Sequence, residues 1–307
     1  MLTYLLRRAT LAAVVMVIVS VICFVLSNVA SDPAMGIAGA QATDEDLALI
    51  RRQYGLDRSL PVQYADYLGG LVQGDFGTSY LSKRPVLEMI TERLPVTALL
   101  AVLSMALALA IALPLGCAAA LWPNTIVDRI AQLLAVAGQA IPNFWAGLLL
   151  IVVFGVQLRW LPISGSQTLA HFVLPTITLG TFAMPPLMRL IRAGMIEVLA
   201  SDYIRTARAM GIRPWQVTFK YALKNAVLPV ISLSAVQFGF MLGGSVVVES
   251  IFALNGVGYL AWQSMSRSDM PVIQAIVLLI SLFYIVLTLL ADLLNGYMDP
   301  RLRSGGK

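Results

Sequence analysis

Six long stretches of the chain contain almost no charged residues and little alternation between polar and apolar positions. They cover residues 9–29, 96–121, 130–156, 172–190, 226–250 and 272–294. A helix needs about 20 predominantly apolar residues to cross the hydrocarbon core of a bilayer. The pattern therefore predicts six transmembrane helices. Pro114, Pro142, Pro185 and Pro186 fall within them, which neighbouring helices tolerate by satisfying the freed carbonyls.

Composition supports an all-α membrane protein with a single transmembrane domain over residues 1–307. The chain is 59% hydrophobic and 12% charged, with a mean hydropathy of +0.82. The first apolar stretch is longer than the ~7–15 residues of a signal-peptide core, so we expect a retained helix. Cys23 and Cys117 both lie in apolar stretches, where cysteine behaves as a small buried hydrophobe.

The positions of lysine and arginine predict the orientation. With the N-terminus inside, the inner segments carry 13 of the 21 cationic residues, and the short outer loops carry only Arg159 and Arg267. Inner loops of membrane proteins are enriched in such residues, whereas long outer segments are largely exempt from this rule. We therefore expect both termini to be cytoplasmic and residues 30–95 to form a long periplasmic segment.

The outer segment 30–95 contains helix signals of its own. Thr43 can cap a helix that runs to about Tyr54 and ends at Gly55, Pro61 can open a second, and Pro85 a third before Leu94. Two interpretations fit: a folded cap over the helix bundle, or a docking surface for an extracytoplasmic partner.

The inner loop 191–225 is the most polar part of the chain. On a helical wheel, Tyr203, Ile204, Ala207 and Met210 fall on one side, and Arg205 and Arg208 on the other. Gly211 suits the left-handed conformation that ends a helix, and Pro214 can open the next one. We therefore predict a short helix, a glycine turn and a second helix.

This hairpin has two interpretations. A short helix across the cytoplasmic side can dock into the groove of another protein, and the small residues Ala207 and Gly211 permit close approach. Alternatively, an amphipathic pair of helices can rest on anionic lipid headgroups, held by its cations. A DNA-binding helix-turn-helix is disfavoured because the hairpin is tethered between two predicted spans.

The loop resembles the cytoplasmic EAA loop of bacterial ABC-importer permeases. "DYIRTARAMG" (202–211) and "NAVLP" carry the likeness, together with "GDFGTSY" (74–80), "IPNFW" (141–145), "WLPISG" (160–165) and "ESIFALNGVG" (249–258). These stretches are similar to the first permease subunit of the dipeptide/oligopeptide/nickel transport family. Two departures are Arg205-Thr206-Ala207 in place of Glu-Ala-Ala, and Asn255 where many relatives have proline.

The resemblance implies a type I ABC importer permease of the bacterial inner membrane. Its implied partners are a second homologous permease, two cytoplasmic ATPase subunits and a periplasmic substrate-binding protein. ATP and magnesium would bind the ATPases, and this chain would bind no cofactor and catalyse no reaction. The implied ATPase-coupling residues are Arg205, Thr206, Ala207, Arg208, Ala209, Met210, Gly211, Ile212 and Arg213.

The remaining chemistry in the sequence is sparse. No nucleotide-binding G-x-x-x-x-G-K-[ST] segment is present, and the single histidine, His171, is expected to be structural. Candidates for helix packing or gating are Gly239, Gly243, Gly244, Glu249 and Asp292.

The sequence leaves alternatives open for both the substrate and the class of transporter. The resemblance favours dipeptides or oligopeptides, but nickel, glutathione and opine importers share the scaffold. An ion-coupled secondary transporter would need titratable groups near the middle of the membrane, and the predicted spans are nearly free of charge there.

Overall fold

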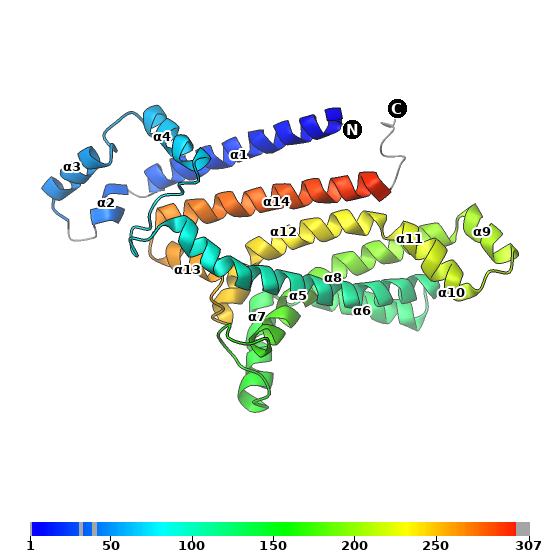
Figure 1. Ribbon diagram of the computed structural model, residues 1–307. Helices are drawn as coiled ribbons and strands as arrows, with labels where there is room; N and C mark the ends of the chain where they lie inside the picture. Colours follow the sequence, from blue (N-terminus) through cyan, green and yellow to red (C-terminus); the bar gives the residue numbers. More distant parts are fainter. Residues whose placement is uncertain (1, 31–32, 39–41, 299–307) are drawn as a thin grey trace. The chain divides into compact units, whose positions relative to one another are not determined.

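The computed structural model describes residues 2–30, 33–38 and 42–298, without the side chains of residues 2–9, 29, 30, 244, 292 and 295–298. Most of this part of the chain is helical (Figure 1). Over the same residues, the only β-type pairing is an isolated bridge between Thr78 and Pro85. The predicted all-α class is confirmed.

The chain divides into two compact units. The first comprises Met1–Thr97 and Asn255–Ile285, and the second comprises Ala98–Leu254 and Val286–Lys307.

The first unit contains the helices of the predicted outer segment. Together with elements from elsewhere in the chain, the first unit consists of α1 (Leu2–Ala30), α2 (Pro33–Ala38), α3 (Asp44–Gln53), α4 (Leu60–Val72), the start of α5 (Val86–Leu121), α13 (Val257–Ser266) and the start of α14 (Met270–Met298). The predicted Thr43 cap is present, because Thr43 and Asp46 form a capping box, and Gly55 has a φ of 67° beyond the helix end. Tyr64 of α4 bonds to Ser20 of α1 at 2.8 Å, which joins these two helices.

A helix does begin directly after Pro85, as predicted, but the prediction that it is separate from the following span is wrong. Instead, α5 begins at Val86 and continues without a break to Leu121, through Pro95. Ile90 and Thr97 lie two turns apart on one face and are both buried. Packing on both sides of Pro95 therefore outweighs the hydrogen bond that proline removes.

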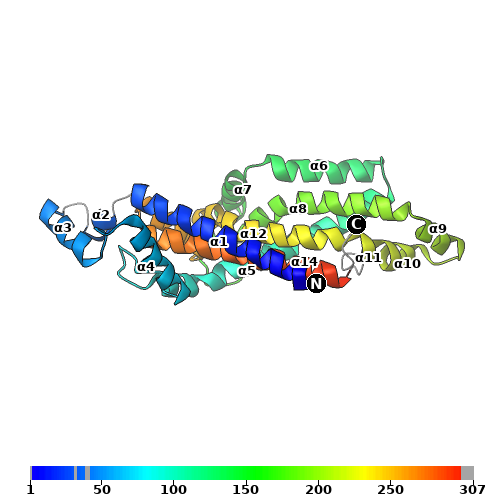
Figure 2. The ribbon, with the colours of Figure 1, turned by 90° about the horizontal axis from the view of Figure 1, so that it is seen from above.

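The second unit is arranged around α8 (Ala170–Leu199). The other elements are the rest of α5 and α14, α6 (Ile126–Ala140), α7 (Asn143–Leu150), a π-helical segment η1 (Ile151–Gln157), α9 (Asp202–Ala209), α10 (Pro214–Gln216), a π-helical segment η2 (Val217–Ala222), α11 (Leu223–Ala226) and α12 (Leu228–Ile251). α6 lies beside α8 (Figure 2), and α7, α11 and α12 also contact α8. A Cβ on Gly180 would lie 2.9 Å from the Ser104 carbonyl oxygen, so this glycine allows α8 and α5 to approach closely.

One predicted span is bent rather than straight, and a second bend lies at the start of another. The stretch 130–156 consists of two helical parts at 97° to each other, and Pro214–Ala226, mostly in the preceding loop, meets Leu228–Gly243 of the predicted span 226–250 at 54°. At the first break, Ile141 is extended because the following Pro142 disfavours the helical conformation there.

Among the described residues, three helices are long and apolar enough to cross a membrane, and the number rises to as many as five if each bent pair forms one span. The three are Thr10–Asn28, Val86–Leu121 and Met270–Ala291. The span count of six stays a prediction.

Candidate coupling site

The predicted helix–glycine–helix pattern of the inner loop is confirmed. α9 ends at Ala209, Met210 closes its last turn, and Gly211 follows with a φ of 74°. The Gly211 amide donates to the Arg208 carbonyl at 3.0 Å and the Ile212 amide donates to Ala207 at 3.2 Å. Pro214 then opens α10 at its first position, where the missing amide hydrogen costs nothing.

One face of α9 is buried against the chain itself. Ile204 is 0% exposed and Ala207 is 6% exposed, so the Ala207 side chain is not open to a partner in this structure. The remaining positions form a surface that we call the exposed α9 surface: Arg205, Thr206, Arg208, Ala209, Met210, Gly211 and Arg213. Ile212 is half-buried between them.

Apolar and cationic groups occur together on this surface. Met210 is 74% exposed, and beyond the turn Trp215 of α10 and Phe219 of η2 are each 58% exposed. Within the described residues of α9, Arg205 pairs with Asp202 at 3.1 Å, and both side chains are largely solvated. Such pairs contribute little, so the positive charge of the surface remains available to a partner.

α9 is firmly attached to the helices behind it. It contacts α8 and η2, and the Asn225 side chain of α11 donates to the Tyr203 hydroxyl at 2.8 Å. α8 and α11 approach so closely that a Cβ on Gly194 would lie 3.0 Å from the Ala226 carbonyl oxygen. A displacement of α9 would therefore carry α8 and α11 with it.

A buried ion pair extends this connection from α8 to α6. Both oxygens of Asp128 accept from Arg192 at 2.7 Å, and they also accept from Gln132 at 2.8 Å and the Asn124 amide at 2.9 Å. Asp128 is 1% exposed. Sequence reasoning missed this pair. The available signal was an acid four residues before Gln132, at the start of a helix with an otherwise apolar face.

Family comparisons agree with this architecture. Residues 112–304 match the model described as "Binding-protein-dependent transport system inner membrane component", and residues 1–101 match the corresponding N-terminal model. The chain belongs to this family. It is a permease component of binding-protein-dependent ABC importers.

Individual relatives are similar to this permease over almost its whole length. The glutathione transport system permease protein GsiC of Salmonella choleraesuis (strain SC-B67) is 42% identical over 304 residues, 99% of either chain. GsiC of Escherichia coli (strain K12) is 41% identical over the same share. The inward facing MetNI methionine ABC transporter superposes with a TM-score of 0.58 and 17% identity, covering 69% of this permease and 97% of that chain. The last comparison shows a shared fold.

The packing and gating candidates lie in the helices predicted for them. In α12, Gly239 is buried, Gly243 is half-buried and Glu249 is fully buried. Gly244 in α12 and Asp292 in α14 have side chains outside the described residues. His171 lies at the start of α8, where its Nδ1 is 3.2 Å from the donating Thr168 amide. A role in gating for any of these residues stays a prediction.

Proposed function

We propose that this permease imports short peptides, with glutathione, itself a tripeptide, among them. The observation that carries the proposal is the 42% identity to a glutathione transport system permease over 99% of both chains. The dipeptide and oligopeptide substrates expected from the sequence belong to the same chemical class. Nickel complexes and opines, which importers with the same scaffold transport, are the alternative substrates.

The proposed assembly places four partner subunits of three kinds around this chain. A second homologous permease completes the pathway, two ATPases bind on the cytoplasmic side, and a periplasmic binding protein delivers the substrate. Residues 30–95 then lie in the periplasm, and residues 191–225 form the cytoplasmic coupling loop of one transmembrane domain. Both termini are cytoplasmic in the bacterial inner membrane.

We further propose that the exposed α9 surface is the contact for an ATPase. Closure of the ATPases would move α9 as a rigid body, because Ile204 and the Tyr203–Asn225 bond join it to the helices behind. α8 would follow, and the Asp128–Arg192 pair would carry the motion to α6. Such tilting of packed helices is a known way to change which side of a pathway is open.

Uptake by the complete importer tests the substrate. The permease pair, the ATPases and the binding protein are reconstituted into vesicles, and labelled glutathione, dialanine and a nickel complex are compared with and without ATP. We expect ATP-dependent uptake of the peptides. Uptake of nickel alone would refute the peptide assignment, and uptake by this chain alone under a proton gradient would indicate a secondary transporter.

A matched pair of charge reversals tests the coupling surface. Arg208→Glu alters the exposed α9 surface, whereas Lys220→Glu makes the same change on exposed η2, outside residues 205–213. Interface hot spots are worth about 2–4 kcal/mol, so Arg208→Glu should lower substrate-stimulated ATPase activity at least tenfold. Equal effects of the two changes would instead favour binding of the hairpin to anionic lipid.

A further inference from the structure

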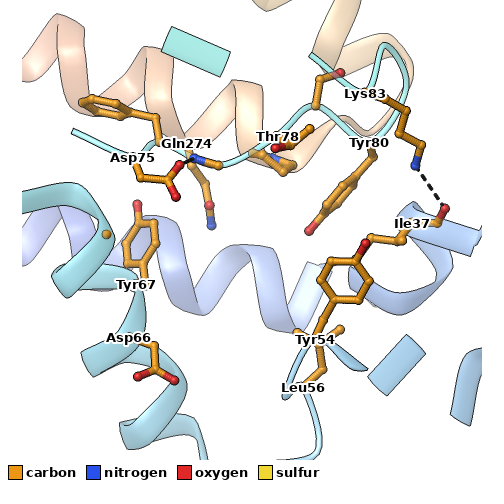
Figure 3. Close-up of a pocket in the computed structure, with 15 residues that line it drawn as sticks. Ile37, Tyr54, Leu56, Asp66, Tyr67, Asp75, Thr78, Tyr80, Lys83 and Gln274 are labelled. Carbon is orange, nitrogen blue, oxygen red and sulfur yellow. Dashed lines mark hydrogen bonds between the residues drawn. The ribbon is translucent and has the colours of Figure 1, made fainter. Parts of the chain in front are cut away.

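A cavity of about 480 Å³ lies within the first unit, between α2, α4, the loop after α4 and α14 (Figure 3). Its volume falls in the range of ~300–1,000 Å³ that is typical of small-molecule sites. We propose that this cavity binds a short zwitterionic peptide, with its ammonium group between Asp75 and Tyr67 and its carboxylate beside Lys83. This inference rests on the proposed function for its choice of peptides.

One wall of the cavity is a loop held in place by a buried carboxylate. Asp269 is 2% exposed and accepts from the Ser79 hydroxyl and from the Tyr80 amide, the latter at 3.0 Å. The Ser79 hydroxyl in turn accepts from the Ser82 amide at 3.0 Å. These bonds fix the loop that carries Lys83 before any ligand arrives, which lowers the entropic cost of binding.

The backbone at Lys83 is itself in an uncommon conformation. Its φ is 57°, and its amide donates to the Ser79 carbonyl at 3.1 Å. A non-glycine residue rarely adopts a left-handed conformation unless its surroundings impose it, and such residues cluster at functional sites. The loop therefore holds the Lys83 side chain at the rim of the cavity against a local backbone preference.

Hydrogen-bond acceptors gather on one side of the cavity, which is formed by α4, the loop that follows it and α14. Asp75 uses one oxygen to accept from the Gly77 amide at 2.8 Å, which orients the carboxylate and leaves the other oxygen for a ligand. Gln274 donates its amide hydrogen to the Cys23 carbonyl at 2.9 Å, so its own carbonyl oxygen remains an acceptor. Acceptors of this kind recognise an ammonium group.

Tyr67 supplies the second observation for a ligand on this side. Its hydroxyl is buried and has no hydrogen-bond partner among the described residues, and it points toward Asp75 in the cavity (Figure 3). Burial raises the pKa of Tyr67 far above its ordinary value, so the group is a neutral phenol at physiological pH. Buried polar groups are nearly always paired, and an ammonium donor between Tyr67 and Asp75 would complete this one.

The other side of the cavity suits the opposite end of a peptide. Lys83, Tyr80 and Tyr54 lie there, across from Asp75 and Tyr67 (Figure 3). Among the described residues, the Lys83 ammonium donates a hydrogen bond only to the Ile37 carbonyl oxygen, at a long 3.4 Å, so the group is free to turn to a carboxylate. The two ends of the cavity thus have opposite charges, with aromatic rings between them.

Direct binding to the assembled importer tests this site. Purified permease pair with both ATPases, without ATP and without binding protein, is titrated with labelled dialanine and labelled glutathione. Asp75→Asn keeps an acceptor for the Gly77 amide, and Tyr67→Phe removes only the hydroxyl. We expect saturable binding of at least one peptide, and at least a tenfold loss of affinity in both variants. Asp44→Asn, an exposed acid of α3 outside the cavity, should bind as the unaltered importer does.

Peptides with a chemically blocked amino or carboxyl terminus identify which terminus binds to Asp75 and which to Lys83. N-acetylation of the peptide should weaken binding to the unaltered importer but cause little further loss in Asp75→Asn. Amidation of the peptide carboxylate should weaken binding to the unaltered importer but cause little further loss in Lys83→Gln. The exposed control Arg52→Gln should respond to amidation as the unaltered importer does.

No saturable binding of either peptide, or unaltered affinity in Asp75→Asn and Tyr67→Phe, would overturn the proposed site. Peptide uptake by the complete importer is measured separately, so the proposed function can fail or survive independently.

Discussion

The Asp128–Arg192 pair offers a quantitative test of how the helices of the second unit are joined. Asp128→Ala removes a carboxylate that accepts four hydrogen bonds and leaves Arg192, Gln132 and the Asn124 amide without their acceptor. Removing one partner of a buried pair costs about 3–5 kcal/mol. The Arg192 side chain is 24% exposed and can recover some hydration, which places the expected cost near the lower limit, about 3 kcal/mol.

Thermal unfolding of the purified importer measures this cost. A change of 1 kcal/mol shifts the midpoint by about 2–4 °C for a domain of this size, so we expect a fall of about 6–12 °C. The double change Asp128→Leu with Arg192→Leu should recover most of it, since an apolar pair leaves no orphaned charge. Arg189→Ala, which breaks the exposed bond to Gln139, should shift the midpoint by less than about 2 °C.

The same variants distinguish a structural pair from one that also transmits motion. If α8 drives α6 through this contact, Asp128→Ala should reduce ATP-dependent uptake at a temperature where the importer is fully folded. An unchanged midpoint in Asp128→Ala would refute the reasoning, as would a double variant less stable than the single one.

Four further predictions follow from single positions. Gly211→Ala should destabilise the hairpin by about 1–2 kcal/mol because of the positive φ, while Gly211→Asn should cost less; equal midpoints for both would contradict a left-handed residue. Ile204→Ala should cost about 2–5 kcal/mol in thermal unfolding because the side chain is fully buried, and an unchanged midpoint would mean that α9 is not packed. Asp269→Asn weakens the acceptor for Ser79 and Tyr80, so trypsin should cleave after Lys83 faster than in the unaltered importer. Burial, with a smaller contribution from Asp269, raises the pKa of Tyr80 to about 12, whereas the hydroxyl of an unfolded chain loses its proton near pH 10. The stability contributed by this neutral phenol is therefore present below pH 10 and is lost as the pH rises to about 12. Ultraviolet titration should show a phenol that ionises near pH 12 in the unaltered importer and is missing in Tyr80→Phe.

Local signals predicted the short helices well. The capping box at Thr43, the glycine behind Tyr54 and the Gly211–Pro214 turn all depend on backbone conformations that only a few residue types favour. These preferences act within four or five residues, and the structure confirms each of them.

Helix continuity was harder to predict. Pro95 is carried inside α5, whereas Pro142 accompanies a 97° bend. The same residue type gives opposite outcomes because the free-energy cost of a proline is small compared with burial of the faces on either side.

The geometry of the coupling site was also only partly predictable from the sequence. The sequence predicted a short helix, a glycine turn and a second helix around residues 205–213, and it offered the small residues Ala207 and Gly211 for close approach by a partner. A helical wheel shows which residues share a face and not what covers that face. In the structure Ala207 is buried in its own chain and Met210 is exposed.

The sequence alone determined the membrane class, the all-α fold, the cap at Thr43 and the turn at Gly211, since hydrophobic length and capping are properties of neighbouring residues. Only the tertiary structure decided which side chains meet: Asp128 with Arg192 across 64 positions, and Ser79 with Asp269 across 190. Polar side chains so far apart in the chain are brought together by packing of apolar faces, and no local pattern encodes that choice.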